Sequence, residues 1–356
     1  MYITNIKLQN FRNYEKEEID LCNKINLFYG ENAQGKTNII ESIFIAAMGK
    51  SFRAKKDEEL IRFNEKNLNI EINYIKDELE KRINILIGEK KEIKINGIKI
   101  TKLSELLGNL NIVIFSPDDI NVLKEGPQKR RKFLNMMISQ LKPGYIYYFN
   151  LYKKTLEQRN NYLKQIKYEK KPIENLEIWD ESLSNYGEKI ANYRKEYVDK
   201  INEKINNIHN KITDDKENKK LEFISDVKNK EQFYELLKKN RNKDIEKGYT
   251  SKGIHRDDFN IYLNDCLVNI YGSQGQHRTA MLSLKLCELY IIKDEIGEYP
   301  VLLLDDFMSE LDDSRRKNFL NSITDAQVII TGTEKILLEK NNINVYNVKK
   351  GMVKQE

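Results

Sequence analysis

The segment GENAQGKT at positions 30–37 constrains the fold of this chain more than any other feature. It matches the pattern G-x-x-x-x-G-K-[ST], with the apolar run INLFY (25–29) before it and the run NIIESIFIAA (38–47), which favours a helix, after it. The two glycines let the backbone wrap closely around phosphate groups, where a Cβ atom would obstruct the approach. A strand, a phosphate-binding loop and a helix in this order predict an α/β domain that binds a nucleotide.

The chemistry of the loop side chains assigns their roles. Lys36 supplies a point charge for the outer phosphates, and the hydroxyl of Thr37 is placed to ligate Mg²⁺. We therefore expect ATP and Mg²⁺ as ligands. The residues expected at the nucleotide are Gly30, Glu31, Asn32, Ala33, Gln34, Gly35, Lys36, Thr37 and Asn38.

A second segment with candidate functional residues is VLLLDD at 301–306. Its four apolar residues predict a buried parallel strand, and ligands of open α/β sheets bind at the carboxyl ends of such strands. We expect Asp305 to hold Mg²⁺, directly or through water, and Asp306 to orient or deprotonate the attacking water as the catalytic residue. The alternative is that the two aspartates form an exposed turn without a ligand.

The α/β pattern is interrupted in the middle of the chain. Apolar residues between 176 and 212 recur at spacings of three and four, which predicts one long helix, and 148–166 predicts a second helix antiparallel to it. Short alternating segments between 68 and 100 predict antiparallel strands. We expect a discontinuous α/β domain formed by 1–116 and 246–356, split by an inserted all-α helical lobe at 117–245 with short antiparallel helices.

Charge and composition limit the class of protein. The formal net charge is +6, from 61 Lys and Arg against 55 Asp and Glu, which permits polyanion binding but requires local clusters to support it. Cys22, Cys266 and Cys287 are scattered, which favours a reducing cytoplasm over a disulfide framework or a zinc site. Because no apolar run approaches the ~20 residues that span a bilayer, we expect no membrane association.

The turn SQGQ at 273–276 opens another predicted helix, 305 − 273 = 32 residues before Asp305. It resembles the signature motif of ABC-type ATPases, in which the signature of one subunit covers the γ-phosphate held by the P-loop of the other. The segment SELD at 309–312 resembles the D-loop that crosses the same dimer interface. The residues expected to act in trans are Ser273, Gly275, Gln276, Ser309, Glu310 and Asp312.

The whole chain resembles the RecF family, the recombination-repair members of the SMC/Rad50-like ABC ATPases. The matching segments run from end to end: NFRNY (10–14), the P-loop, GKSFR (49–53), FSPDD (115–119), PQKRRKFLN (127–135), LEQRN (156–160), WDESL (179–183), IHRDDF (254–259), SQGQ and DDFMSELDDSRR (305–316). The fold implied is an ABC-type ATPase head, a P-loop core with an antiparallel β subdomain, split by the helical lobe.

The resemblance also implies function and further site residues. It implies an ATP-gated homodimer that binds DNA at single-strand gaps and junctions, promotes RecA loading with RecO and RecR, and hydrolyses ATP slowly with stimulation by DNA. In related ATPases the corner at Arg12 and Asn13 touches the nucleotide; a surface loop is the alternative. FSPDD stands at the place of the Q-loop, and Thr331 and Thr333 are the candidates for the place of a switch histidine.

Two basic clusters are candidate DNA surfaces: KSFRAKK (50–56) and KEGPQKRRK (124–132). Lysine and arginine clusters bind DNA phosphates by releasing counterions, and the absence of a base-reading motif predicts sequence-independent binding to double-stranded and single-stranded DNA. A solvated charged face is the alternative. The residues expected at DNA are Arg53, Lys55, Lys56, Lys129, Arg130 and Arg131.

Two other functions compete with a DNA-repair ATPase. A transporter-type ABC subunit would need a membrane partner, and the helical insert, the paired aspartates and the basic clusters count against it. An ATP-gated scaffold, in which hydrolysis is incidental, would use the same Asp305 and Asp306. The segment IHRDDF (254–259) is expected to form an ion-paired structural turn rather than a catalytic site.

Overall fold

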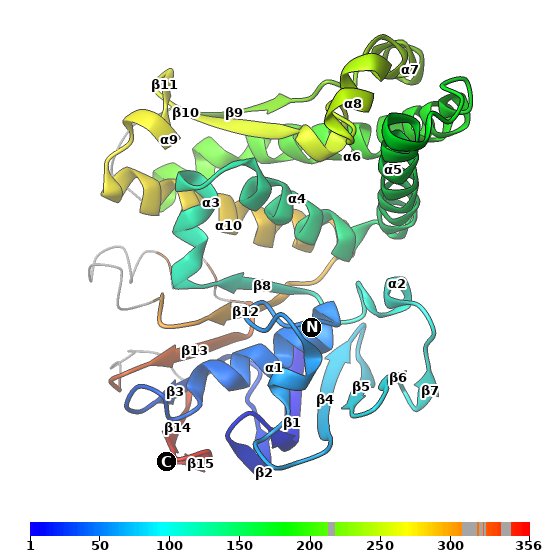
Figure 1. Cartoon of the computed structure of the whole chain (residues 1–356). Helices are drawn as coiled ribbons and strands as arrows, with labels where there is room; N and C mark the ends of the chain where they lie inside the picture. The colour runs from blue at the N-terminus through cyan, green and yellow to red at the C-terminus, as the bar shows by residue number, and fades with distance from the viewer. Residues whose placement is uncertain (213–217, 308–318, 320–322, 324, 336–342) are drawn as a thin grey trace. The chain divides into compact units, whose positions relative to one another are not determined.

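The first part of the chain forms a six-stranded antiparallel sheet in the order β2-β1-β4-β5-β6-β7 (Figure 1). In β4, Leu68, Ile70, Ile72 and Tyr74 are buried and the residues between them are partly exposed, so one face of the strand packs on the core. The strands are β1 (Tyr2–Phe11), β2 (Tyr14–Asp20), β4 (Leu68–Lys76), β5 (Leu79–Ile87), β6 (Lys91–Ile95) and β7 (Ile98–Lys99). The alternating segments between 68 and 100 are confirmed as antiparallel strands.

A second sheet, in the order β15-β14-β3-β13-β12-β8, holds the core of the α/β domain. All its neighbouring strands are parallel except β15, which pairs with β14 antiparallel at one edge. Strands β12 and β13 are buried along their whole length, as apolar runs inside a parallel sheet should be. The strands are β3 (Ile25–Tyr29), β8 (Ile112–Phe115), β12 (Val301–Leu304), β13 (Val328–Gly332), β14 (Ile343–Lys349) and β15 (Met352–Gln355).

Helix α1 (Lys36–Met48), labelled in Figure 1, follows the P-loop. Nearly all of its residues are buried. Ile39, Ile40 and Phe44 are among the residues that it contributes to the core. It ends at Gly49, whose left-handed conformation places its N–H on the Ile45 carbonyl. The shorter helices of this region are η1 (Asp57–Leu60), α2 (Leu103–Leu106) and η2 (Pro117–Ile120).

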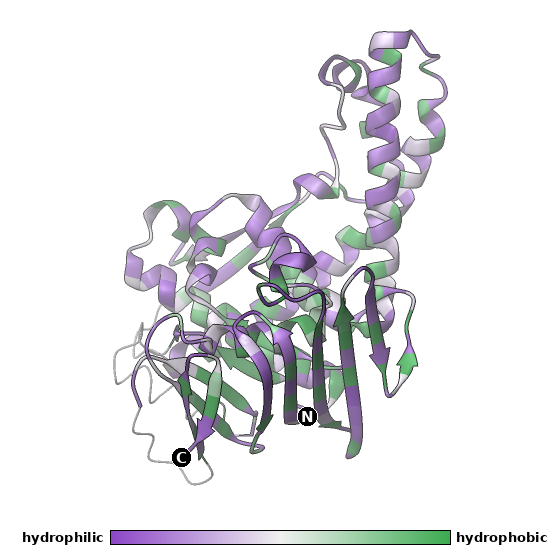
Figure 2. Ribbon diagram, turned by 60° about the horizontal axis from the view of Figure 1, so that its bottom comes forward, coloured by the Kyte–Doolittle hydropathy of each residue, from purple (hydrophilic) through white to green (hydrophobic). Residues whose placement is uncertain are grey.

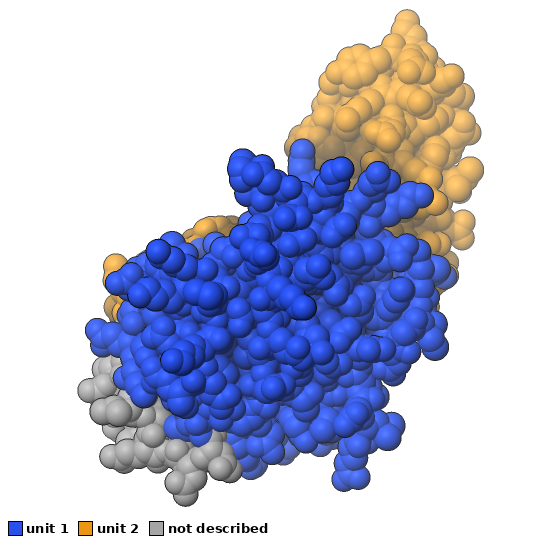
Figure 3. Space-filling view, turned by 90° about the horizontal axis from the view of Figure 1, so that it is seen from below, with its two compact units in different colours: residues 1–119, 211–214, 282–356 blue, residues 120–210, 215–281 orange. Residues whose placement is uncertain are grey.

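This computed structural model describes residues 1–212, 218–307, 319, 323, 325–335 and 343–356. The chain divides into two compact units, coloured separately in Figure 3. Unit 1 comprises 1–119, 211–214 and 282–356, and unit 2 comprises 120–210 and 215–281. Helix α10 (Gln274–Ile296) runs from unit 2 into unit 1.

Unit 2 is built on two long helices, α5 (Pro143–Glu169) and α6 (Leu176–Ile212). Tyr145 lies against Tyr193 near the start of α5, and Tyr162 lies against Trp179 near its end, so the two helices run antiparallel as predicted. In Figure 2 both helices are mostly hydrophilic, with apolar residues in patches. The other helices are α3 (Asn121–Lys124), α4 (Pro127–Leu141), α7 (Lys230–Lys239), α8 (Arg241–Lys247), η3 (Ile254–Arg256) and α9 (Val268–Tyr271).

Unit 2 also contains a three-stranded antiparallel sheet in the order β11-β10-β9. Its strands are β9 (Lys219–Ile224), β10 (Asp258–Leu263) and β11 (Cys266–Leu267). Strand β9 lies inside the segment that was expected to be all helical, so that expectation is wrong here. The strand gave no clear sequence signal because it is short and half polar, and because its partner β10 lies nearly 40 residues further along the chain. The unit boundary after the insert falls at 281/282 rather than at 245/246, since β10 and β11 pack with the inserted segment.

Candidate nucleotide site

The P-loop connects β3 to α1 and draws its own lysine inward. The ammonium of Lys36 donates to the carbonyl oxygens of Gly30 at 2.7 Å and Glu31 at 2.8 Å, and only 4% of the residue is exposed. Gly35 has φ +119°, and a Cβ there would lie 2.6 Å from Nδ2 of Asn13, so this position requires glycine. The predicted loop is therefore held in one conformation around a fixed cation.

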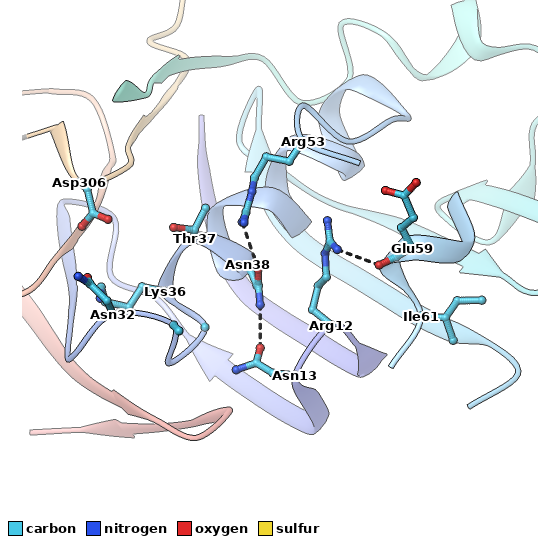
Figure 4. A pocket seen from close by; sticks show the side chains of 12 residues that line it. Arg12, Asn13, Asn32, Lys36, Thr37, Asn38, Arg53, Glu59, Ile61 and Asp306 are labelled. Atoms are coloured by element: carbon cyan, nitrogen blue, oxygen red, sulfur yellow. Dashed lines mark hydrogen bonds between the residues drawn. The ribbon is translucent and has the colours of Figure 1, made fainter. Parts of the chain in front are cut away.

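A pocket of about 520 Å³ opens beside this loop (Figure 4). Side chains from four segments line it: the corner after β1, the P-loop, the loop and η1 helix after α1, and the end of β12. The lining residues are Arg12, Asn13, Asn32, Ala33, Gly35, Lys36, Thr37, Asn38, Arg53, Glu59, Ile61 and Asp306. Eight of the eleven residues expected at the nucleotide, all but Gly30, Glu31 and Gln34, thus surround one cavity with the expected catalytic aspartate.

Asp305 at the end of β12 meets the P-loop threonine directly. The Thr37 hydroxyl donates to Oδ1 of Asp305 at 2.8 Å, and the Thr331 hydroxyl at the end of β13 donates to the same oxygen at 2.9 Å. Burial raises the pKa of Asp305, while the hydrogen bonds from Thr37 and Thr331 act in the opposite direction. A carboxylate and a hydroxyl this close together form a donor set that suits Mg²⁺.

Asp306 occupies a backbone conformation that is rare for an aspartate, with φ +51°. Its N–H donates to Oγ1 of Thr331 at 3.0 Å, so the hydroxyl of Thr331 connects the two aspartates. Left-handed residues at functional sites re-aim the side chain at a small energetic cost. The hydroxyl of Thr331 is thus engaged with both aspartates, while Thr333, the other residue considered for the switch position, is exposed.

The corner at Arg12 and Asn13 supports the P-loop from one side. Nδ2 of Asn13 donates to the Gln34 carbonyl at 2.7 Å, and its Oδ1 accepts from Asn38 at 2.8 Å. Arg12 makes a bidentate ion pair with the fully buried Glu41 of α1, at 2.9 Å on each oxygen. Glu41 therefore fixes the guanidinium of Arg12 at the pocket wall, a contact that no sequence motif indicated.

The C-terminal hairpin supports the same loop from the other side. The backbone N–H of Lys350 donates to Oε1 of Gln34 at 2.7 Å, and that of Gly351 donates to the Gln34 carbonyl at 3.2 Å. Gly351 has φ +72°, and a Cβ there would overlap the carbonyl oxygen of Asn13. The β14–β15 turn is thus part of the P-loop mounting. It was missed because neither strand was identified from the sequence.

Arg53 is the one expected DNA contact that lies in the nucleotide pocket. Its NH1 reaches Oδ1 of Asn38 at 3.4 Å, and its charge acts on the carboxyl of Asp305 (Figure 4). Lys55 and Lys56, two and three residues further on, are exposed to solvent. The basic cluster 50–56 therefore divides between the pocket and the surface.

The second cluster corrects the DNA prediction more strongly. Arg130 is 5% exposed and makes a bidentate ion pair with Asp258, at 2.6 and 2.9 Å. Arg131 donates to the Asp257 carbonyl at 2.7 Å, and burial lowers its pKa. The carboxylate of Asp258, the first residue of β10, and the backbone of Asp257 before it therefore hold these two arginines in the fold. Lys129 lies 3.6 Å from Glu125, and its side chain is 39% exposed.

The same pattern explains two further segments of the sequence. Arg159 of LEQRN is fully buried and donates to Asp180 of WDESL at 2.7 Å, and Arg194 donates to Asp257 of IHRDDF at 2.7 Å. Nε2 of His255 donates to the Thr250 carbonyl at 3.0 Å, and its Nδ1 lies 2.9 Å from the Tyr152 hydroxyl. The expectation of an ion-paired structural turn at 254–259 is confirmed.

The SQGQ turn forms the start of α10. The hydroxyl of Ser273 accepts from the Gln276 N–H at 3.2 Å, and the Gln276 side chain accepts from the Ser273 N–H at 2.9 Å, which is a capping box. Ser273 and Gly275 are exposed at the positive end of a 23-residue helix. Ser309, Glu310 and Asp312 of the expected D-loop lie outside the described residues.

Comparison with known proteins places the whole chain in a family. The family model for the RecF/RecN/SMC N-terminal domain matches residues 2–354. The DNA replication and repair protein RecF of Clostridium tetani is 48% identical to this chain over 364 residues. The alignment covers 99% of each of the two chains. RecF of Clostridium novyi is 44% identical, with 100% of both chains covered.

Solved structures agree. The recombination mediator protein RecF with ATP, of the RecFOR pathway, superposes with a TM-score of 0.92 at 39% identity over 100% of this chain and 97% of that one. An Smc head domain from Pyrococcus furiosus, bound to the C-terminal domain of ScpA, is 18% identical over 100% of this chain and 96% of that one; its TM-score of 0.56 shows a shared fold. None of the helices within the described residues has the length and apolarity to cross a membrane. The chain belongs to the RecF family of DNA replication and repair proteins and has the mixed α/β fold of an ABC ATPase head.

Proposed function

We propose that this protein is an ATP-dependent DNA-binding protein of recombinational repair that closes as a homodimer around ATP. The observation that carries the proposal is the pocket in which Lys36, Thr37 and Asp306 converge, with Asp305 hydrogen-bonded to Thr37. Its volume of about 520 Å³ lies within the range of small-molecule sites. The solved RecF structure with ATP supports the choice of nucleotide.

The residues around the pocket have distinct roles in ATP binding and hydrolysis. The N-terminus of α1 and the ammonium of Lys36 bind the phosphates, because backbone N–H groups, helix dipole and cation all attract negative charge. Thr37 and Asp305 would hold Mg²⁺, which neutralises charge on the phosphates. Asp306 orients the attacking water and accepts its proton. The ion pair with Glu41 keeps Arg12 at the pocket wall throughout.

The exposed start of α10 supports dimer formation. Ser273 and Gly275 are exposed at a helix N-terminus, where the positive end of the helix dipole favours a phosphate. We infer that this turn, together with the D-loop residues Ser309, Glu310 and Asp312, completes the site of a second subunit. Each ATP is then held between two copies of the chain, so hydrolysis depends on dimerisation.

The biological setting rests on the family. We infer that the dimer acts in the cytoplasm, binds double-stranded and single-stranded DNA at gaps and junctions without sequence preference, and assists RecA loading together with RecO and RecR. The RecFOR pathway of the matched structure supports these partners. Hydrolysis is expected to be slow and stimulated by DNA, with ATP binding as the main gate.

Two substitutions test the nucleotide chemistry. Lys36→Ala should abolish ATP binding, because it removes the only side-chain cation that the P-loop itself contributes. Asp306→Asn should keep ATP binding and the dimer but slow turnover by more than ~10²-fold, about 2.7 kcal/mol of activation free energy. Normal hydrolysis by Asp306→Asn would remove this residue from the catalytic role.

The dimer is tested by measuring the specific ATPase rate against protein concentration, with sedimentation on the same samples. The rate should fall as the dimer dissociates. Ser273→Arg should prevent dimerisation and leave ATP binding by the monomer intact, because the bulky cation occupies the surface that faces the partner. A constant specific rate in samples that contain only monomers would contradict composite active sites.

A further inference from the structure

One side of α5 in unit 2 carries a row of exposed lysines. Lys153, Lys164 and Lys167 are all exposed and recur at spacings of 11 and 3 residues, so they project from the same helical face. Glu157 is the acidic residue in the same row. From Lys153 to Lys167 is 167 − 153 = 14 residues, which at 1.5 Å per residue makes the row about 21 Å long.

The end of α8 and the segment after it border this row. Nζ of Lys167 donates to the Glu246 carbonyl at 2.7 Å, and an added Cβ at Gly248 would lie 3.4 Å from Cγ of Lys164. Asn160, also on this face of α5, accepts from the N–H and the hydroxyl of Thr250. The residues 246–250 therefore lie directly beside the lysine row.

This bordering segment adds two more cations and fixes them on an aromatic ring. Lys247 and Arg256 each lie 5.7 Å from the ring centroid of Tyr249, which is 41% exposed. Cation–π contacts of this kind hold flexible side chains in place, so less conformational entropy is lost when they bind an anion. We define the arm as the helix pair α5 and α6 with α8 beside α5, and the arm basic face as Lys153, Lys164, Lys167, Lys247 and Arg256.

The second helix of the arm carries mixed charge. The exposed residues of α6 include Glu181 and Glu196, with Lys189 and Lys195 among them. Glu174 and Glu177, at the turn into α6, are exposed as well. Acidic and basic side chains are therefore mixed on the exposed surface of α6, whereas the arm basic face gathers five cations beside Glu157.

We propose that the arm basic face binds the sugar–phosphate backbone of duplex DNA, an inference that rests on the proposed DNA-binding function. At a rise of roughly 3.4 Å per base pair along the axis of duplex DNA, a row about 21 Å long matches about six base pairs. Lys247 and Arg256 occupy the neighbourhood of the Tyr249 ring, so the face contacts phosphates and does not stack on bases. This replaces Arg130 and Arg131 as the source of the electrostatic contacts.

The test is the salt dependence of binding to a duplex of random sequence by the full-length chain with ATP. Lys164→Gln combined with Lys247→Gln should weaken binding and reduce the slope of log K against log[salt] by about 1.8, from roughly 0.9 per lost phosphate contact. The matched control is Lys189→Gln with Lys195→Gln, which makes the same charge change on α6, outside the arm basic face. ATP binding and the thermal midpoint are measured for both variants, and neither should change.

The outcomes distinguish a failure of the arm basic face as the DNA surface from a failure of the proposed DNA-binding function itself. A slope that stays at the wild-type value in the Lys164/Lys247 variant overturns the arm basic face as the DNA surface. Equal loss of slope in both variants also overturns it, because the effect would then follow net charge alone. If the wild-type protein binds no duplex in any nucleotide state, the proposed DNA-binding function fails first.

Discussion

The nucleotide pocket of unit 1 and the ion pairs of unit 2 use the same residue types for different purposes. At the pocket, Lys36 and Arg53 line a cavity of about 520 Å³. In unit 2, Arg130, Arg159 and Arg194 are 5%, 0% and 1% exposed, and each donates to an aspartate. A cation beside a cavity is available to a ligand, whereas a cation closed against a carboxylate is part of the fold.

The two arrangements also differ in energy. A buried ion pair adds little net stability, because desolvation of both groups offsets their attraction. Removing one partner is expensive, since the remaining charge stays buried and unpaired. The arginines of unit 2 are therefore expected to report on folding when they are substituted, and the cations of the pocket to report on nucleotide affinity.

The largest expected effect contrasts two neighbours on α4. Arg130→Gln leaves Asp258 without its bidentate partner and should lower the free energy of unfolding by about 3–5 kcal/mol. Lys129→Gln removes an exposed side chain and should change it by less than about 0.5 kcal/mol. Urea unfolding of the two variants measures both. Equal stability would mean that Arg130 is not structural, and the comparison between the two regions would fail.

The sequence could not separate these neighbours reliably. A signal was present: the residues three, four and seven places after Arg130 are Phe133, Leu134 and Met137, all buried. That spacing places Arg130 on the packed face of α4. Which carboxylate would receive it was not readable, because Asp258 is 128 residues away and reaches it only through the fold.

The P-loop and the paired aspartates were predictable for the opposite reason. A P-loop is a local structure, and carboxylates at the end of a parallel strand meet other strand ends at the same edge of the sheet. The expected meeting of Thr37 with Asp305 is found across 268 residues of sequence. The supports of the loop were not predictable, since Glu41 lies in an apolar helix and Gly351 in a hairpin without a recognised pattern.

The next prediction extends the comparison to pH. Burial lowers the pKa of His255 to about 4, while Arg256 and Arg131 act in the same direction and the Thr250 carbonyl and Asp244 oppose them. In the unfolded chain the pKa is about 6.5, so the unfolded state binds the proton first as pH falls. The full stability is present above pH 6.5 and decreases toward pH 4, by about 2 kcal/mol at pH 5.

The measurement is the urea midpoint of the wild type and of His255→Gln between pH 7 and pH 5. Glutamine can bond to Tyr152 and Thr250 but does not titrate, so the variant should lose less stability over this interval. Burial raises the pKa of Asp257, which acts with the opposite sign, and the difference between the two proteins cancels that contribution. Parallel pH profiles would show that His255 is protonated within the fold.

A smaller effect is expected at the C-terminal hairpin. Gly351→Ala places a Cβ against the Asn13 carbonyl and should displace the turn from Gln34, weakening ATP binding about tenfold, or 1.4 kcal/mol. Gly97→Ala is the matched control, because Gly97 has a similar φ of +83° but no heavy atom within 4 Å of an added Cβ. Titration with ATP should separate the two. Equal affinities would remove the hairpin from the P-loop mounting.

The smallest effect tests whether Arg53 belongs to the nucleotide pocket or to the DNA surface. Its guanidinium is exposed and only 3.4 Å from Asn38, so solvent screens it, and Arg53→Gln should weaken ATP binding by no more than about fivefold, within 1 kcal/mol. As a pocket residue it should leave the salt dependence of DNA binding unchanged, whereas Lys55→Gln should leave ATP affinity unchanged. A variant of Arg53 that binds ATP normally but shows a reduced salt slope would return this residue to the DNA surface. The pocket would then hold one cation fewer than its geometry indicates.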